Sequence, residues 1–224
     1  MSKPIGVVCV SGGVDSCVSA AVALESHDAA FLHVNYGQRT EARELKCFRD
    51  IADFYKVEKR LVVELGFLGK IGGSSLTDKT QPVPEGRLGR EDIPSTYVPF
   101  RNANILSAAV AWAETLGAQA VYLGAHEQDS SGYPDCRAGF FEAFGKAVGL
   151  GTRPQSKIRI VTPVLAMSKA EVVRKGRELG APLELTWSCY RDEQVACGRC
   201  DSCLLRLRAF AEAGISDPIP YRKK

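Results

Sequence analysis

The sequence predicts a Rossmann-like, doubly wound α/β fold with a mainly parallel five-stranded sheet. Short apolar runs rich in β-branched residues alternate with longer stretches of helical periodicity. This alternation is typical of parallel strands joined by helices that cover both faces of the sheet. A glycine-rich turn, Ser11-Gly12-Gly13, separates the first apolar run from the first helical stretch.

The first part of the chain has the order strand, helix, strand, helix, strand. Residues 5–10, 29–34 and 60–65 are short apolar runs and predict three buried strands. Alanine, valine and leucine crowd residues 16–25, which predicts the first helix. Thr40 is expected to cap the second helix. The apolar face of that helix is formed by Leu45, Phe48, Ala52 and Tyr55.

Residues 66–98 interrupt this pattern. They contain six glycines and three prolines and show no sustained periodicity. A loop of this length is usually a functional lid or a disordered insert. The sequence favours a lid.

Regular periodicity returns in the second part of the chain. A helix is predicted from residue 102 to Gly117, which suits its C-terminal cap. Residues 120–124 and 158–161 predict the fourth and fifth strands, with a helix at residues 139–148 between them.

Two further helices complete the predicted fold. Ser168 and Glu171 form a capping box for a helix that Gly180 ends. The final helix is amphipathic, and its apolar face carries Leu204, Leu207, Phe210 and Ala211.

The string Ser11-Gly12-Gly13-Val14-Asp15-Ser16 joins the first strand to the first helix. Small residues let backbone N–H groups approach phosphate oxygens, and the start of a helix adds partial positive charge. The string lacks the Gly-Lys-Ser/Thr ending of a Walker A loop and the third glycine of a dinucleotide fingerprint. Asp15 either caps amides of its own loop or helps to hold Mg²⁺. We interpret the string as a phosphate-binding loop rather than an ordinary tight turn.

Four of the eight cysteines stand close together: Cys189, Cys197, Cys200 and Cys203. A Cys-x-x-Cys-x-x-Cys run lets three thiolates turn onto one ion, and the preceding cysteine can complete a tetrahedron. Gly198 suits the turn between ligands, and Arg199 and Arg206 are expected to offset the thiolate charge. We interpret the cluster as a structural zinc site that holds the C-terminal helical segment. An iron–sulfur cluster uses similar spacing and remains the alternative. Cys9, Cys17 and Cys47 are expected to be small core residues.

Length and charge narrow the class of protein. The 224 residues are enough for one α/β domain with a small appendage. The 29 basic and 26 acidic residues give a net charge of +3, too balanced to make nucleic acid an obligatory partner. Neither a secretory signal nor an apolar stretch of membrane-spanning length is evident, so we expect a cytoplasmic protein without a membrane partner.

The phosphate loop resembles the pyrophosphate loop of the N-type ATP pyrophosphatases, which adenylate their substrates and release pyrophosphate. Further strings resemble one family of that superfamily, the 7-cyano-7-deazaguanine synthases of queuosine biosynthesis. The resemblance covers residues 5–218. Its strings are Asn35-Tyr36-Gly37-Gln38-Arg39, Ile93-Pro94-Ser95-Thr96-Tyr97-Val98-Pro99, Asp129-Ser130-Ser131-Gly132-Tyr133-Pro134-Asp135-Cys136-Arg137 and Leu185-Thr186-Trp187-Ser188-Cys189-Tyr190.

The resemblance implies a ligase that converts 7-carboxy-7-deazaguanine and ammonia to 7-cyano-7-deazaguanine. ATP, with Mg²⁺, would adenylate the carboxylate, and ammonia would displace AMP to give an amide. A second ATP would activate the amide oxygen, and loss of AMP would leave the nitrile. The resemblance also implies one structural zinc per chain, a homodimer, an ATP pyrophosphatase domain at residues 1–185 and a zinc-binding segment at residues 186–224.

The resemblance assigns residues to two kinds of site. The nucleotide-binding residues are expected to be Val8, Cys9, Val10, Ser11, Gly12, Gly13, Val14, Asp15, Ser16, Cys17, Val18, Arg101 and Lys169. The substrate-binding residues are expected to be Tyr36, Arg39, Asn102, Asp129, Tyr133 and Asp135. The carboxylates could pair with the N–H groups of a guanine-like base, and Tyr133 could stack on it. The competing interpretations are surface ion pairs for Arg39 and Arg101 and a solvated helix position for Lys169.

Three alternatives differ in chemistry. The same adenylation could serve an amine other than ammonia, which full turnover with ammonia alone would exclude. A tRNA-thiolating enzyme of the superfamily would need a persulfide-carrying cysteine or an iron–sulfur cluster beside the adenylate, and salt-dependent tRNA binding. A non-catalytic nucleotide-binding module would bind ATP without releasing pyrophosphate.

Overall fold

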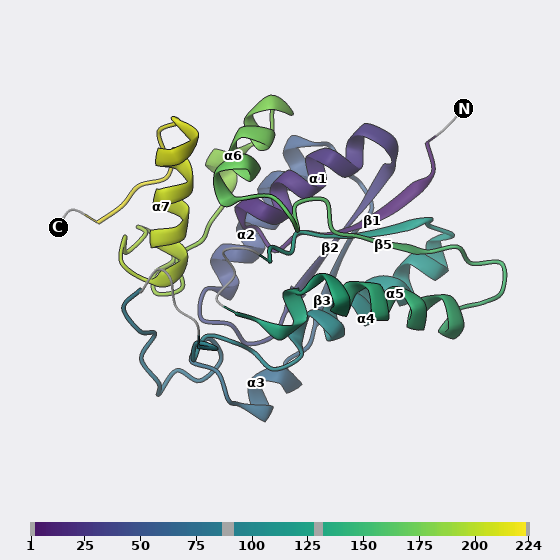
Figure 1. The fold of residues 1–224 in the computed structure, drawn as a ribbon, viewed down its shortest axis with the longest axis horizontal. Helices are drawn as coiled ribbons and strands as arrows, with labels where there is room; N and C mark the ends of the chain where they lie inside the picture. The colour runs from purple at the N-terminus through teal and green to yellow at the C-terminus, as the bar shows by residue number, and fades with distance from the viewer. Residues whose placement is uncertain (1–2, 87–91, 128–131, 223–224) are drawn as a thin grey trace.

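The computed structural model describes residues 3–86, 92–127 and 132–222. Five parallel strands form one sheet in the order β3-β2-β1-β4-β5 (Figure 1). In the central strand, Val8 pairs with Phe31 on one side and Tyr122 on the other. The predicted parallel sheet is confirmed. Its strands are β1 (Ile5–Cys9), β2 (Asp28–Asn35), β3 (Arg60–Glu64), β4 (Ala120–Leu123) and β5 (Arg159–Val161).

Helices cover both faces of this sheet (Figure 1). Successive side chains of a strand point to opposite faces. Val8 therefore packs in the core formed with α1, α2, α6 and α7, whereas Val7 packs in the core formed with α4 and α5. Burial on both faces explains why the strands are continuous apolar runs. The helices are α1 (Val14–Ser26), α2 (Glu41–Phe54), α3 (Phe67–Ile71), α4 (Arg101–Leu116), α5 (Ala138–Gly151), α6 (Lys169–Glu178) and α7 (Asp201–Ala213).

The helix ends follow local sequence signals, with one exception. The capping box at α6 is confirmed, because the Ser168 hydroxyl accepts the Glu171 N–H and the Glu171 carboxylate accepts the Ser168 N–H. Gly117 ends α4 in the left-handed conformation, with φ of 65°. Thr40 stands at the N-cap position of α2 but makes no side-chain cap bond. Its hydroxyl donates to the Glu44 carboxylate instead, at 2.8 Å.

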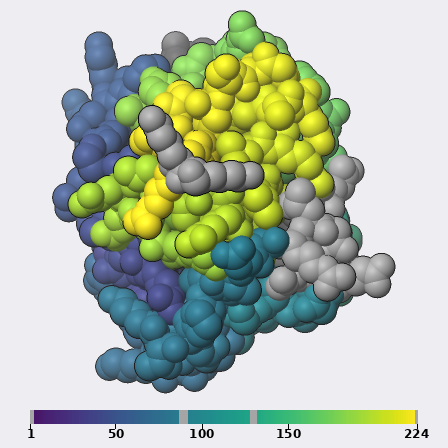
Figure 2. Space-filling view, turned by 90° about the vertical axis from the view of Figure 1, so that its left-hand side faces the viewer, coloured from purple at the N-terminus to yellow at the C-terminus, as the bar shows by residue number. Residues whose placement is uncertain are grey.

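The long loop after β3 contains one short helix, α3, and otherwise follows turns. Ser74 and Ser75 are fully buried, so this part of the loop packs as core. The Gly86 N–H donates to the Arg199 carbonyl at 2.7 Å. Figure 2 shows the blue-teal loop lying against the yellow-green C-terminal segment. A lid function for residues 66–98 stays a prediction.

The C-terminal segment is joined to the main core. Ala209 and Phe210 of α7 pack in the same core as Val18 of α1 and Val172 of α6. The following chain returns to the cysteine cluster, where Ala196 and Tyr221 form an isolated parallel bridge. Among the described residues, the helices are too short or too polar to cross a bilayer.

Candidate active site and metal centre

A pocket opens at the carboxyl ends of β1 and β4, where the strand order reverses. Open α/β sheets bind ligands at this point. One wall, here called the sheet wall, consists of residues 11 and 13–16, Gly124 and Lys169. The opposite wall, here called the cysteine wall, comes from the C-terminal segment. Its members are Trp187, Ser188, Tyr190, Ser202 and Arg206.

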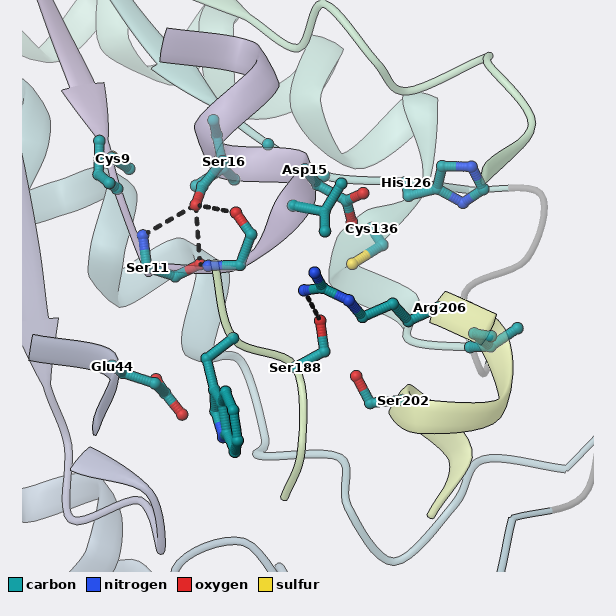
Figure 3. A pocket seen from close by; sticks show the side chains of 18 of the residues that line it. Cys9, Ser11, Asp15, Ser16, Glu44, His126, Cys136, Ser188, Ser202 and Arg206 are labelled. Atoms are coloured by element: carbon teal, nitrogen blue, oxygen red, sulfur yellow. Dashed lines mark hydrogen bonds between the residues drawn. The ribbon is translucent and has the colours of Figure 1, made fainter. Parts of the chain in front are cut away.

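The phosphate loop is held in a tight curl by two hydroxyls (Figure 3). The Ser16 hydroxyl accepts from the Ser11 N–H at 3.2 Å and donates to the Gly13 carbonyl at 3.0 Å. The Ser11 hydroxyl accepts the Gly13 N–H at 3.3 Å. Gly12 has φ of +90°, and a Cβ atom there would lie 2.8 Å from the Glu44 carbonyl oxygen. Only glycine fits this conformation and this contact.

A second glycine brings β4 onto the start of α1. A Cβ atom on Gly124 would lie 2.6 Å from both the carbonyl carbon of Asp15 and the nitrogen of Ser16. These are backbone atoms that cannot move aside without displacing the phosphate loop. The sequence marks Gly124 only as the end of a strand, so this role becomes visible in the structure alone.

Lys169, the first residue of α6, reaches the phosphate loop. Its Nζ lies 2.5 Å from a carboxylate oxygen of Asp15, and both side chains line the pocket. The carboxylate of Asp15 thus bonds a lysine, and α1 has no side-chain cap. Of the two predicted roles for Asp15, capping its own loop gains no support, and the Mg²⁺ role stays a prediction.

Only part of the predicted nucleotide-binding run, residues 8–18, lines the pocket. Seven of its residues line the cavity: Cys9, Val10, Ser11, Gly13, Val14, Asp15 and Ser16. Val8, Cys17 and Val18 are fully buried behind the loop and belong to the core. Gly12 does not line the cavity, and it packs against the backbone of Glu44.

Arg101 begins α4 and enters the pocket between aromatic rings. It donates to the Tyr36 hydroxyl at 3.2 Å, and its guanidinium carbon lies 5.6 Å from the centre of that ring. Burial raises the pKa of Tyr36 to about 12, against the opposing effect of Arg101. Burial also raises the pKa values of Tyr133 and Tyr190. Arg101 therefore faces neutral phenols, and its buried Nε makes no hydrogen bond within the described part of the chain.

Two predicted substrate residues, Asn102 and Asp135, bind each other. The Asp135 carboxylate accepts the Asn102 backbone N–H at 2.9 Å, and the Asn102 amide donates to the Asp135 carbonyl at 3.0 Å. Asp135 Oδ1 is buried and has no hydrogen-bond partner in the residues described. Tyr133 lines the pocket, with its hydroxyl 2.9 Å from that of Thr96.

The structure does not bring Arg39 to the pocket. Its Nε donates to the Ser75 carbonyl at 2.6 Å and its Nη2 to the Asp78 carbonyl at 2.8 Å. It thereby fixes a turn of the long loop. Asp129 lies outside the described residues, so its predicted role stays a prediction.

The sequence interpretation missed several pocket residues, above all Glu44 and Arg206. Burial raises the pKa of Glu44 to about 7, although hydrogen bonds from Thr40 and Gln38 oppose the rise. Neither residue belongs to a string with an evident ligand role. In the sequence Glu44 resembles the other acids of its helix, and Arg206 was assigned to the thiolates, so only the fold places these two residues at the pocket.

Arg199 and Arg206, which were expected to offset the thiolate charge, each form an ion pair with a carboxylate. Arg206 is nearly fully buried and binds Asp217, with Nε 2.8 Å from the carboxylate. It also donates to the hydroxyls of Thr186 and Ser188, at 2.8 and 3.3 Å. Arg199 is exposed and pairs with Glu85 at 3.6 Å.

The cysteines divide into two kinds. Cys9, Cys17 and Cys47 are buried, which confirms them as core residues, and burial raises the pKa of Cys9 to about 12. Cys136 lines the pocket beside Asn102, and burial raises its pKa to about 11. Near neutral pH the pocket thiols of Cys9 and Cys136 are therefore protonated and weakly nucleophilic.

The four C-terminal cysteines converge. Their ligand atoms all lie within 4.8 Å of one another. Backbone N–H groups point at two of the sulfurs, from Cys197 to Cys189 Sγ at 3.3 Å and from Cys200 to Cys197 Sγ at 3.4 Å. Gly198 supplies the predicted turn with φ of +71°. Four thiolates in a closed cluster fit a tetrahedral structural metal such as zinc and leave no position for a reacting water.

The metal centre and the pocket share a stretch of chain. Cys189 lies between Ser188 and Tyr190, which both line the pocket, and Cys200 stands at the N-cap position of α7, two residues before Ser202. A metal ion bound to these cysteines would therefore fix the position of the cysteine wall.

Comparisons with known proteins agree with this arrangement. The family model described as queuosine biosynthesis protein QueC matches residues 5–214. The chain is 57% identical over 216 residues to 7-cyano-7-deazaguanine synthase of Chlorobaculum parvum, covering 96% of this chain and 95% of that protein. It is 55% identical over 217 residues to the protein of the same name from Chloroherpeton thalassium, covering 96% of each.

Solved structures show likeness in fold. The U34-tRNA thiolase NcsA from Methanococcus maripaludis, solved with its [4Fe-4S] cluster, superposes with a TM-score of 0.52 at 14% identity. The likeness covers 81% of this chain and 58% of that chain. At this identity it supports the α/β fold alone.

Proposed function

The chain belongs to the family of queuosine biosynthesis protein QueC, and from this premise we propose that it is a 7-cyano-7-deazaguanine synthase. The enzyme is a carbon–nitrogen ligase that converts 7-carboxy-7-deazaguanine and ammonia to the nitrile, with two ATP cleaved to AMP and pyrophosphate. The proposal depends on one observation: the chain is 55% and 57% identical to two proteins of that name over 96% of its length. Its predicted phosphate loop also faces a pocket.

The sheet wall is the site proposed for the nucleotide. Backbone N–H groups at the start of α1 and the Ser11 and Ser16 hydroxyls suit phosphate oxygens. Lys169 supplies a positive charge at the same place, and ATP would compete with Asp15 for it. Asp15, once released, would be available to Mg²⁺ bound with the nucleotide. Donors placed around the leaving pyrophosphate stabilise charge that develops in the transition state.

The pocket floor around Arg101 is the site proposed for the deazaguanine. Arg101 lies among neutral phenols, so its charge is available to the substrate carboxylate or to the α-phosphate. Asp135 Oδ1 and Arg101 Nε are buried polar atoms without hydrogen-bond partners among the described residues. Buried polar groups of this kind are usually satisfied by a ligand or water. Tyr133 is close enough to the cavity to contact the base.

The chemistry needs no protein nucleophile. Holding the carboxylate in line with the α-phosphorus, and ammonia beside the resulting adenylate, supplies the rate enhancement through positioning. The raised pKa values of Cys9 and Cys136 agree with this, since a tRNA-thiolating enzyme that carries a persulfide would need a reactive thiol in the pocket. We further propose that the enzyme acts as a cytoplasmic homodimer with one structural zinc per chain.

The first half-reaction offers a direct test. ATP–pyrophosphate exchange should occur when 7-carboxy-7-deazaguanine is present and ammonium is absent. Lys169→Met should lower the exchange rate by about 100-fold or more, because a donor to the transferring phosphate group is lost. Lys175→Met is the matched control on the same helix, since Lys175 pairs with Glu178 away from the pocket.

Two outcomes would change the proposal. Nucleotide binding without exchange would favour a non-catalytic module. Exchange without any product from ammonium would favour another amine as the acceptor.

A further inference from the structure

Glu44 has no role in the function proposed so far, although it lines the pocket next to the phosphate loop. It lies in the first turn of α2, whose backbone touches Gly12. Gly12 in turn accepts the Trp187 N–H at 2.8 Å. Figure 3 shows the Glu44 carboxylate on the same side of the pocket as Ser11, with Ser188 across from it. Glu44 thus lies where the sheet wall meets the cysteine wall.

The carboxylate of Glu44 is held in one orientation by two donors. Thr40 Oγ1 donates to one oxygen at 2.8 Å, and Gln38 Nε2 donates to the other at 3.2 Å. Gln38 is itself fixed, because its Oε1 accepts the Tyr36 N–H at 2.8 Å. Gln38 and Thr40 are both buried. Each carboxylate oxygen keeps a second lone pair beyond these bonds.

Two charged groups act on Glu44, one on α4 and one on its own helix. Burial raises its pKa to about 7, Arg101 of α4 lowers it, and Glu41 of the same helix raises it. Among the described residues, Tyr36 and Cys47 also interact with Glu44, and their pKa values are raised to about 12 and about 11. Both stay neutral near pH 7. A carboxyl group in these surroundings exchanges a proton close to neutral pH, which is the property of an effective general base.

We propose that Glu44 accepts the protons released at nitrogen during amide and nitrile formation. This assignment rests on the proposed function. In the first step ammonia forms a C–N bond with the acyl adenylate, and one N–H proton passes to Glu44. AMP then leaves with the electron pair of the broken C–O bond, and the amide remains.

The second stage releases two protons. Attack of the amide oxygen on ATP expels pyrophosphate and leaves a cationic nitrogen with two hydrogens. Loss of the first proton gives a neutral imidate adenylate. When the second proton leaves, the N–H electron pair forms the third bond between carbon and nitrogen. The C–O bond breaks at the same time, and AMP leaves with the electron pair of that C–O bond. Glu44 accepts these protons singly and returns each to water in the pocket.

The test separates adenylation from the nitrogen steps. Glu44→Gln should keep acid-dependent ATP–pyrophosphate exchange within about 3-fold of wild type and lose nitrile formation by about 100-fold or more. Glu41→Gln is the matched control, because the Glu41 carboxylate accepts the Gly37 N–H outside the pocket lining. It should keep both activities. Glu44→Asp restores a carboxylate and should recover part of the lost rate.

The pH profile identifies a base. At a fixed concentration of unprotonated ammonia, the wild-type rate should rise through about pH 7 and then level off, because only the ionised Glu44 accepts a proton. Glu44→Gln should lack this rise while keeping the wild-type melting temperature. The assignment is overturned if Glu44→Gln forms nitrile at near wild-type rates, keeps the same rise, or loses exchange as well. A wild-type enzyme that exchanges pyrophosphate but forms neither amide nor nitrile overturns the proposed function and this role together.

Discussion

The two walls of the pocket are held in place by different forces. The sheet wall follows directly from a buried strand, and its shape is set by close backbone contacts at Gly12 and Gly124. The cysteine wall has no strand behind it. It is held by the four clustered cysteines, the isolated Ala196–Tyr221 bridge and the buried Arg206–Asp217 pair.

This difference suggests where each wall is vulnerable. The sheet wall shares its hydrogen bonds and apolar packing with the central sheet, so it should withstand loss of metal. The cysteine wall depends on a few specific contacts within the C-terminal segment, and its loss should open the pocket while the sheet stays folded.

The largest effect is expected when the metal centre is broken. Cys200→Ser removes one of four ligands and should lower bound zinc from about one ion per chain to a small fraction. Turnover should fall by at least about 10-fold, because Ser188, Tyr190 and Ser202 lose their fixed positions. Metal analysis and far-ultraviolet circular dichroism would be measured together. Cys47→Ala, at a buried cysteine outside the cluster, should retain the metal. Full metal loss with unchanged turnover would show that the cysteine wall keeps its position without the metal, as the sheet wall is expected to do.

The buried ion pair gives the next largest effect. Arg206→Met leaves Asp217 charged and buried, which should lower the free energy of unfolding by about 3–5 kcal/mol. The double variant with Asp217→Asn should lose less free energy of unfolding than Arg206→Met alone, since no unpaired charge then remains. Urea unfolding would measure both variants. Lys46→Met removes an exposed pair with Asp50 and should change stability little. An equally small change for Arg206→Met would contradict the importance of this contact.

A smaller effect on stability is expected in the sheet wall. Gly124→Ala places a methyl group against the backbone of Asp15 and Ser16, which should cost about 1–3 kcal/mol and weaken ATP binding. Gly149→Ala, in a helix with open space around it, should instead stabilise by up to about 1 kcal/mol. Calorimetry with and without ATP would compare the two. If Gly124→Ala binds ATP normally, the backbone contact does not shape the phosphate loop.

The same contrast explains how far the sequence predicted the molecule. The strands and the α6 capping box are local signals, because each depends on neighbouring residues, and both are confirmed. The tight loop at residues 11–16 is equally local, but its phosphate-binding role stays a prediction. The cysteine cluster was also local enough to recognise from spacing. The partner of Arg206 could not be predicted, because Asp217 reaches Arg206 only where the chain folds back after the end of α7.

Residue roles in the pocket were harder to predict for the same reason. Arg39 and Arg101 both follow strings of the same family pattern, yet only Arg101 lines the pocket. Arg39 donates hydrogen bonds to carbonyl groups of the long loop, a segment whose path could not be predicted from the sequence. Glu44 shares a helix turn with ordinary surface acids, and only the fold distinguishes it.

The proposed function requires that both oxygens of the same carboxyl group are adenylated in turn. It can be tested with 7-carboxy-7-deazaguanine labelled with ¹⁸O at both carboxylate oxygens, together with ATP, Mg²⁺ and ammonium. Mass spectrometry should find two AMP for each nitrile, and each AMP should carry one ¹⁸O atom, because both oxygens leave bonded to an α-phosphorus. Unlabelled AMP, or labelled AMP without nitrile, would contradict the claim.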